Sequence, residues 1–274
     1  NLSPHGVKLV LPTILKALDD SAWRSKAAAL SLLGAMAYCA PKQLSSCLPQ
    51  IVPRMTEAFG DTHPKVRESG KTALGDIGKV IRNSEIRKLS PLLLSALYDP
   101  AKHTKDALDG LLACEFMHSV DAPSLALLIP IVQRGLKDRA ADLKRKASLI
   151  TGNMCSMISD ARDLVPYLPA LLPGLKGALV DPIPDVRATT ARALGSLMRG
   201  MGEESLFDLV PWLVQTLKTD ASSVERSGGA QGLAQVLVSL GDIRVRAVLT
   251  DLLALKGHPR YSVREGVLWV LSFL

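Results

Sequence analysis

The side chains in this sequence that could bind a charged partner are its lysines and arginines. The 274-residue chain contains 33 Lys and Arg against 26 Asp and Glu, a formal net charge of +7. Surface cations hold phosphates and carboxylates, so this balance favours nucleic acid or an acidic protein as the partner. Aromatic residues make up only 4% of the chain, which disfavours recognition of single strands by base stacking.

The cations concentrate in two stretches. The denser stretch, 134–146, holds six cations against two aspartates. The second lies on and just after a predicted helix over 65–81, where Arg67, Lys71 and Arg82 are spaced to share one helix face. A ridge of this kind, continued by cations of the next repeat, could grip phosphates or an acidic protein segment.

The patterns that would indicate catalysis are missing. The sequence has no GxxxxGK[ST] phosphate loop, no HExxH and no GxSxG turn. The run 227–232 comes closest to a dinucleotide-binding loop, but Ser227 stands where the first glycine belongs. We expect its glycines to let a neighbouring helix approach closely.

The rest of the composition also gives no sign of a metal or cofactor site. The four cysteines show neither CxxC spacing nor a histidine at zinc spacing, so we expect small buried side chains. No apolar run approaches the ~20 residues that a membrane span needs. We therefore expect no enzyme activity, no metal, no cofactor, no small-molecule ligand and no membrane contact.

The elements that carry these residues recur about every 40 residues. Prolines in apolar stretches are 37 to 42 residues apart, and apolar residues followed by a polar or charged one are 38 to 43 apart. The first series is Pro12, Pro49, Pro91, Pro130, Pro169 and Pro211; the second is Trp23, Val66, Thr104, Leu143, Val186, Val224 and Val263. A period of this size is typical of stacked helix pairs. The sequence predicts an all-α fold, a HEAT-type α-solenoid that stacks about seven helix pairs in a right-handed superhelix.

We expect one continuous solenoid over 1–274. The repeats are predicted at about 5–38, 44–81, 85–117, 123–157, 164–199, 206–239 and 243–274. Their first helices end near 18, 59, 97, 136, 179, 217 and 255, and their second helices begin near 22, 65, 102, 141, 184, 222 and 261. Neither end looks like the polar cap that a complete solenoid needs, so we expect a piece of a longer array.

The turn inside each helix pair carries an aspartate. Asp accepts backbone N–H groups at turns and helix starts. These residues are Asp20, Asp61, Asp99, Asp138, Asp181 and Asp220. The six prolines fall within the first helices, and we interpret them as kinks that fit a curved stack.

The position of each cation within its repeat, here called its phase, divides the cations into two sets. Those that share one phase are interpreted as a structural ladder that pairs with the turn aspartate of their own or the next repeat. They are Arg24, Arg67, Lys144, Arg187 and Arg264. The candidates for partner contact, most of them off this phase, are Lys65, Lys71, Lys102, Lys105, Arg145 and Arg192.

Two long runs are not dictated by repeat chemistry: GAMAYCAPKQLSSCLP at 34–49 and DAPSLALLIPIVQR at 121–134. Together with 200–213 and 222–234, they resemble the general-control (Gcn-type) translational activators, which are very large HEAT-repeat proteins. The resemblance covers nearly the whole chain, weakens after about residue 240, and falls in the part related to fungal translation elongation factor three.

The resemblance implies a ribosome-binding scaffold. Such a protein senses stalled or amino-acid-starved ribosomes and promotes activation of the kinase that phosphorylates the alpha subunit of translation initiation factor two. The implied partners are the ribosome, through its RNA or stalk proteins, and an ABC-type ATPase protein. The kinase would be reached indirectly through other segments, and the implied location is the cytoplasm, on ribosomes.

Two alternatives remain at this point. A tubulin-binding array of the TOG type also stacks HEAT units and uses a Trp and basic residues in its turns, and Trp23-Arg24 stands in such a turn. A general protein-interaction scaffold is the other alternative.

Overall fold

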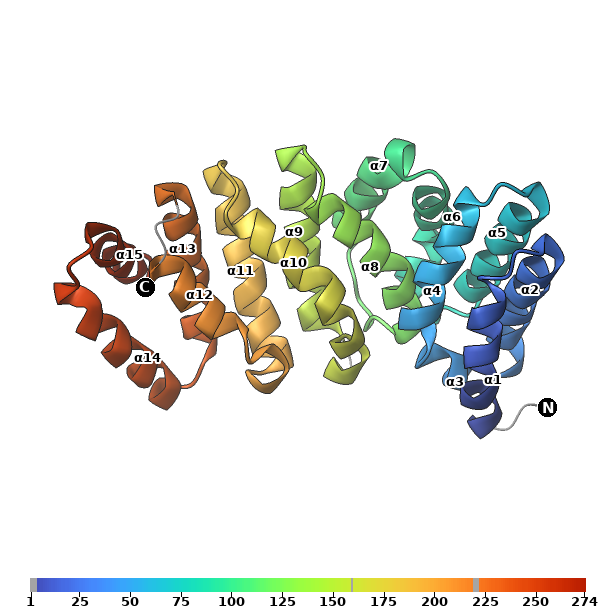
Figure 1. Cartoon of the computed structure of the whole chain (residues 1–274), viewed down its shortest axis with the longest axis horizontal. Helices are drawn as coiled ribbons and strands as arrows, with labels where there is room; N and C mark the ends of the chain where they lie inside the picture. The colour runs from blue at the N-terminus through green and yellow to red at the C-terminus, as the bar shows by residue number, and fades with distance from the viewer. Residues whose placement is uncertain (1–3, 159, 219–221) are drawn as a thin grey trace. The chain divides into compact units, whose positions relative to one another are not determined.

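The computed structural model describes residues 4–158, 160–218 and 222–274. Within these ranges the chain consists of α-helices with short 3-10 turns, and extended pairing is limited to one isolated parallel bridge between Val120 and Ile158. Successive helices lie in antiparallel pairs (Figure 1). The prediction of an all-α fold built from repeated helix pairs is confirmed.

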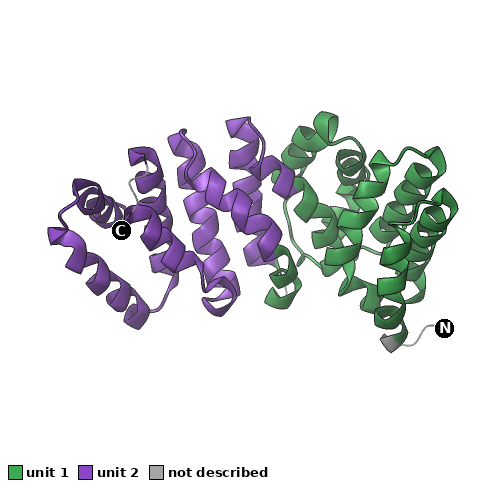
Figure 2. Cartoon of the chain, viewed as in Figure 1, with its two compact units in different colours: residues 1–131, 158–167 green, residues 132–157, 168–274 purple. Residues whose placement is uncertain are grey.

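The chain divides into two compact units (Figure 2). Unit 1 comprises residues 1–131 and 158–167. Its helices are α1 Pro4–Ala17, α2 Trp23–Cys39, α3 Pro41–Ser45, α4 Leu48–Glu57, α5 Pro64–Lys79, α6 Ser84–Tyr98 and α7 Pro100–Ala113, followed by the start of α8 (Ala122–Leu136) and the 3-10 turns Ala58–Gly60, Ala161–Asp163 and Val165–Tyr167. Helix α2 packs on α5 and α6 packs on α7, around fully buried residues such as Leu33, Leu74 and Leu108.

Unit 2 comprises residues 132–157 and 168–274. Its helices are α9 Ala141–Met157, α10 Leu168–Leu179, α11 Pro184–Met201, α12 Leu209–Lys218, α13 Ser223–Ser239, α14 Asp242–Ala254 and α15 Tyr261–Phe273, with the 3-10 turns Glu204–Leu206 and Leu255–Gly257. The second helices α9, α11, α13 and α15 pack in succession. Backbones approach closely at glycines of these helices: a Cβ added to Gly195 of α11 would lie 2.8 Å from the Gln235 carbonyl oxygen of α13, and one added to Gly228 of α13 would lie 2.0 Å from the Leu179 carbonyl oxygen at the end of α10. The interpretation of the glycines at 227–232 as close-contact positions is confirmed.

One difference from the predicted helix bounds is the end of α7. The sequence predicts a helix to about residue 117, whereas α7 ends at Ala113. The following segment is held by the Asn83 side chain, whose amide donates to the carbonyl oxygens of His118 and Ser119, each at 3.1 Å. Because these bonds and the bridge at Val120 satisfy extended backbone, the helix stops early.

The interpretation of all six periodic prolines as kinks is wrong for three of them. The first helix predicted for each of these repeats is divided in the structure: α3 precedes α4, two 3-10 turns precede α10, and one 3-10 turn precedes α12. Pro49, Pro169 and Pro211 therefore lie in the first turns of α4, α10 and α12. A proline in a first turn removes an N–H that has no helical partner, so it costs little there. The prolines inside helices are Pro12, Pro53, Pro91, Pro130 and Pro173.

The turn aspartates form a recurring local structure. One carboxylate oxygen accepts the N–H of the residue two positions later at Asp20, Asp61, Asp138 and Asp181, at 2.8–2.9 Å. Asp99 instead directly precedes α7 without a side-chain cap, and Asp220 lies outside the described residues. These turns directly precede the second helices α2, α5, α9 and α11, which carry the candidate cations Lys65, Lys71, Arg145 and Arg192.

Candidate functional site

One member of the expected ladder forms the expected ion pair. Lys144 on α9 places its Nζ 2.6 Å from Oδ2 of Asp181, the turn aspartate of the next repeat. Asp181 is buried, which by itself raises the pKa of its carboxyl. The hydrogen bonds from Lys144 and from the Ile183 N–H outweigh burial and leave that pKa below its ordinary value. This cation is therefore held by the fold.

Three ladder arginines bind the turn backbone instead of a carboxylate. Nη1 of Arg67 donates to the carbonyl oxygens of Asp61 and Thr62 at 2.7 and 2.9 Å. Arg187 makes the same pair of bonds to residues 181 and 182, and Arg264 to residues 258 and 259. These guanidinium groups close their own turns and are occupied by that role.

Arg24 departs from the ladder interpretation. The neighbouring Lys26 reaches the turn aspartate of the next repeat, with Nζ 2.8 Å from Oδ2 of Asp61. Its hydrogen bond, followed by that from the His63 N–H, lowers the pKa of Asp61. Since Lys26 takes this role, Arg24 is left on the surface, and it lies over the ring of Trp23.

Trp23, Arg24, His63 and Lys65 form a compact group at the turns of unit 1, here called the Trp23 cluster. The indole of Trp23 stacks on the imidazole of His63, with ring centres 4.1 Å apart and planes 6° apart. Arg24 Cζ lies 4.7 Å and Lys65 Nζ 5.3 Å from the centre of the indole ring. Both cationic side chains are exposed, and neither forms an ion pair with any described residue. The cluster thus presents two cations on one aromatic support.

The backbone fixes the position of His63. Its N–H donates to Oδ1 of Asp61 at 2.8 Å, and its Nδ1 accepts the N–H of Lys65 at 3.2 Å. Because Nδ1 is an acceptor, the neutral ring carries its proton on Nε2. The imidazole of His63 therefore has a fixed position, and the indole of Trp23 stacks on it.

A second aromatic support in unit 1 carries Lys71. Its Nζ lies 5.5 Å from the ring centre of Tyr98, and the Tyr98 hydroxyl donates to the Lys71 carbonyl oxygen at 2.9 Å. Phe59 packs edge-on against Tyr98 with ring centres 5.0 Å apart. Burial raises the pKa of the Tyr98 phenol, so the ring that faces Lys71 is neutral.

The other candidates for partner contact have different surroundings. Lys102 and Lys105 are exposed on α7 of unit 1. In unit 2, Arg145 is half-buried and forms ion pairs with Asp142 and Asp185, at 3.1 and 3.5 Å. Arg192 is exposed on α11, where Nη2 donates to the Thr189 hydroxyl at 3.3 Å.

The expected shared face of Arg67, Lys71 and Arg82 is wrong for Arg82. That residue lies beyond the end of α5, and its N–H donates to Oδ2 of Asp121 at 2.8 Å. The low aromatic content argues only against base stacking, and neither aromatic support is predicted from the sequence. The available signal was spacing: Trp23 and His63 stand 40 residues apart, one repeat length.

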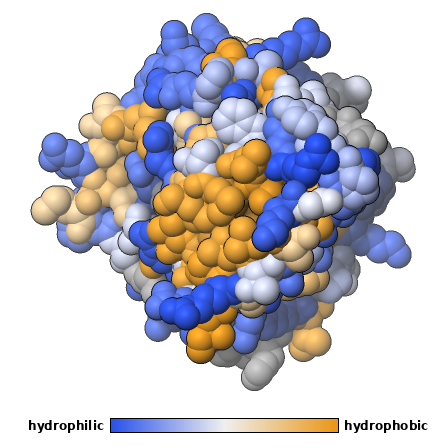
Figure 3. Space-filling view, turned by 90° about the vertical axis from the view of Figure 1, so that its left-hand side faces the viewer, coloured by the Kyte–Doolittle hydropathy of each residue, from blue (hydrophilic) through white to orange (hydrophobic). Residues whose placement is uncertain are grey.

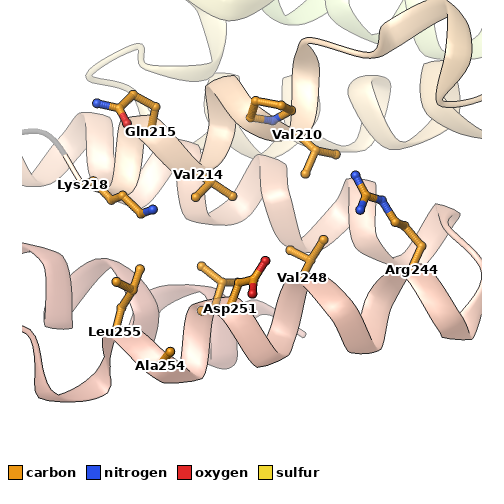
Figure 4. A pocket seen from close by; sticks show the side chains of 11 residues that line it. Val210, Val214, Gln215, Lys218, Arg244, Val248, Asp251, Ala254 and Leu255 are labelled. Carbon is orange, nitrogen blue, oxygen red and sulfur yellow. The ribbon is translucent and has the colours of Figure 1, made fainter.

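A surface hollow lies in unit 2 between α12 and α14. Its volume is about 560 Å³, and valines at 210, 214 and 248 line it from the two helices (Figure 4). Lys218, Arg244 and Asp251 lie among its other lining side chains, and Arg244 is paired with Glu203 at 2.7 Å. Apolar side chains and charged side chains of both signs line this hollow, so it is not a specific site for phosphates.

The end of unit 2 formed by α14 and α15 also carries apolar surface (Figure 3). Its large exposed apolar residues are Ile243, Leu253, Tyr261, Leu268, Trp269, Leu271 and Leu274. Such a patch is suited to apolar contacts and does not attract a polyanion. This apolar patch therefore suits a different kind of partner from the exposed cations of unit 1.

The described residues offer little for catalysis. No group of three His, Cys, Asp or Glu among them could hold a metal ion. Burial raises the pKa of the Cys155 thiol to about 12 and also raises that of Cys114, which makes both poor nucleophiles. No helix in the described ranges is long and apolar enough to cross a bilayer.

Comparison with known proteins gives two family matches. The family described as "Elongation factor 3/GNC1 HEAT repeat" matches residues 102–208, and that described as "EF3 N-terminal HEAT repeat" matches residues 1–74.

Much longer relatives align over the whole chain or nearly all of it. It is 55% identical to "Protein ILITYHIA" of Arabidopsis thaliana over 100% of the chain, and 54% identical to "eIF-2-alpha kinase activator GCN1" of Dictyostelium discoideum over 99%. It is 51% identical to "Stalled ribosome sensor GCN1" of Homo sapiens over 100%. The chain spans 10% of the length of each of these relatives.

Proposed function

This chain belongs to the Gcn-type branch of the elongation factor 3/GNC1 family of HEAT-repeat proteins, and from this premise we propose that it is a ribosome-binding scaffold segment. The whole protein would sense stalled or amino-acid-starved ribosomes. It would then promote activation of the kinase that phosphorylates the alpha subunit of initiation factor two.

Two kinds of observation support this proposal. Two of the relatives carry the names stalled ribosome sensor and eIF-2-alpha kinase activator. The single observation on this chain that carries the proposal is the set of exposed cations on unit 1: Lys65 and Lys71 lie on aromatic supports, and Lys102 is exposed on α7. Ribosomal RNA is a dense array of phosphates, to which such cations bind through charge.

The segment acts without chemistry of its own in this proposal. Its ladder cations bind backbone carbonyls, a carboxylate or an aromatic ring, and burial keeps its two perturbed thiols protonated. Further partners would be an ABC-type ATPase protein, and the kinase through other segments of the whole protein. The place of action would be the cytoplasm, on ribosomes.

Ribosome sedimentation tests the proposal. The chain and a variant with the unit 1 candidates Lys65, Lys71, Lys102 and Lys105 changed to Glu are each sedimented with purified eukaryotic ribosomes at several salt concentrations. We expect the wild-type chain to sediment with ribosomes and the variant to lose most of that binding.

The matched control reverses the same number of charges at exposed cations outside the candidates. These are Lys8, Lys88, Arg199 and Lys256. Equal binding by the two variants would contradict the choice of surface. Absence of wild-type binding to ribosomes, together with sedimentation on microtubules, would replace the proposal with the tubulin-binding alternative.

A further inference from the structure

We propose that the Trp23 cluster is a clamp for RNA phosphates, in which Arg24 and Lys65 bind the RNA backbone while Trp23 and His63 hold them in place. The inference rests on the proposed function for the identity of the RNA as ribosomal, and it specifies RNA over ribosomal protein.

The cluster carries charge that the surrounding carboxylates do not neutralise. Asp61 is bound by Lys26, while Arg54 is paired with both Asp19 and Glu57. Arg24 and Lys65 remain exposed without an ion pair among the described residues. These groups comprise four cations and three carboxylates, so one positive charge is in excess, and the two exposed cations present it to a polyanion.

The aromatic support reduces the cost of binding. Long cationic side chains ordinarily lose rotamer freedom when they bind. Here a single indole ring holds both groups, with Cζ of Arg24 at 4.7 Å and Nζ of Lys65 at 5.3 Å from its centre. Both measurements share one centre, so the two cations lie within about 10 Å of each other, close enough to act on one stretch of backbone.

The geometry favours phosphate contact over base stacking. His63 covers one face of the indole at 4.1 Å, so that face is closed to a base. The cations over the ring are the groups offered to solvent. Contacts from Arg and Lys to phosphates position a protein on RNA without reading its sequence.

The hollow beside the cluster disfavours an acidic peptide as the partner. It is a cavity of about 190 Å³ whose lining includes Asp19, Glu57 and Asp61. These carboxylates are already paired with the lining residues Lys26 and Arg54. An acidic side chain inserted into this hollow would therefore find no free cation, whereas an extended phosphate backbone can bind the two exposed cations without entering it.

RNA binding in solution tests the clamp. A fluorescent oligouridine and an RNA duplex are titrated with the chain at several salt concentrations, with polyglutamate as a competing polyanion. The variants are R24Q/K65Q, W23L, W23F and the control K8Q/R199Q, which removes one lysine and one arginine at exposed positions elsewhere. Circular dichroism checks that each variant is folded.

Removal of charge and removal of the support have different signatures. We expect R24Q/K65Q to bind oligouridine about tenfold more weakly and to lower the slope of log K against log salt by about 1.4, which is about 0.7 for each lost phosphate contact. W23L keeps the charges, so it should weaken binding about two- to five-fold with the slope unchanged. W23F keeps a ring and should bind better than W23L, and the control should match the wild type.

Two results of the RNA titrations would overturn the inference. One is R24Q/K65Q binding both RNAs as well as K8Q/R199Q does. The other is polyglutamate binding to the cluster more tightly than RNA, which would indicate an acidic protein partner. Ribosome binding that persists in R24Q/K65Q but not in the four-charge variant refutes the clamp and leaves the proposed function standing. RNA binding through the cluster without ribosome binding supports the clamp and refutes the proposed function.

Discussion

The turns of unit 1 and the turns of unit 2 use their cations differently. In unit 2, Lys144 is held by the buried Asp181, and Arg226 lies 2.6 Å from Glu265 with both side chains largely buried. In unit 1, Lys26 takes the turn aspartate, and Arg24 and Lys65 lie exposed on Trp23. Both units join neighbouring helices through a lysine and the turn aspartate of the next repeat, but in unit 1 this lysine is Lys26, which leaves Arg24 and Lys65 available to a partner.

The difference shows that repeat phase alone does not determine the role of a residue. Lys144 follows the apolar residue of its repeat by one position, whereas Lys26 follows Trp23 by three. Both nevertheless reach the turn aspartate of the next repeat. A shift of two positions along a helix is enough to transfer the structural role and release Arg24.

The largest effect should come from the close helix contact of unit 2. A Cβ at position 228 would lie 2.0 Å from the carbonyl oxygen of Leu179, so backbone must move in Gly228→Ala. We expect the free energy of unfolding to fall by about 3 kcal/mol. Thermal unfolding followed by circular dichroism measures this.

Gly177→Ala is the matched control for this substitution, because nothing lies within 4 Å of the added methyl group. We expect it to be neutral or to stabilise by about 0.5 kcal/mol, since alanine favours helix. Equal effects of the two substitutions would mean that close packing does not distinguish these positions.

The second effect concerns the buried ion pair of unit 2. Lys144→Met leaves the buried Asp181 carboxylate without its cation, and we expect a loss of about 2 kcal/mol at neutral pH. The double variant K144M/D181N should recover part of this loss. A double-mutant cycle by urea denaturation gives the coupling.

The same pair should also give a pH signature. The pKa of Asp181 is lowered in the fold, so its contribution to stability is present above the unfolded value near 3.8 and is lost as the pH falls through the folded value. The stability difference between wild type and Lys144→Met should therefore shrink as the pH falls below about 4. A difference that stays constant with pH would exclude this carboxylate as the cause.

The corresponding pair of unit 1 should matter less. The side chains of Lys26 and Asp61 are 26% and 13% exposed, against 22% and 4% for Lys144 and Asp181. We expect Lys26→Met to cost about 1 kcal/mol, because solvent compensates Asp61 more readily. If Lys26→Met lowered the free energy of unfolding as much as Lys144→Met does, the two ion pairs would not differ between the units.

The smallest effect on stability should come from the Trp23 cluster. We expect R24Q/K65Q to change the free energy of unfolding by about 0.5 kcal/mol, since both cations are exposed. Thermal unfolding checks this expectation. A loss of several kcal/mol would make the two cations structural rather than available for binding.

The helix pairs could be predicted from sequence because apolar periodicity and turn aspartates are local signals. The predicted second helix at 141–157 and the observed α9 coincide. The early end of α7 could not be predicted, since it depends on Asn83 bonding to residues 35 and 36 positions away. The Trp23 cluster was missed for the same reason: its stacking joins residues one repeat apart, and only Lys26 taking Asp61 frees Arg24.

The most direct test of the contrast between the units is ribosome sedimentation with two variants of equal charge change. K65E/K71E reverses the cations on aromatic supports in unit 1, and R145E/R192E reverses the candidates of unit 2. We predict that K65E/K71E weakens ribosome binding about tenfold more than R145E/R192E does, a difference of about 1.4 kcal/mol. Equal losses, or a larger loss from R145E/R192E, would contradict the assignment of the binding surface to unit 1.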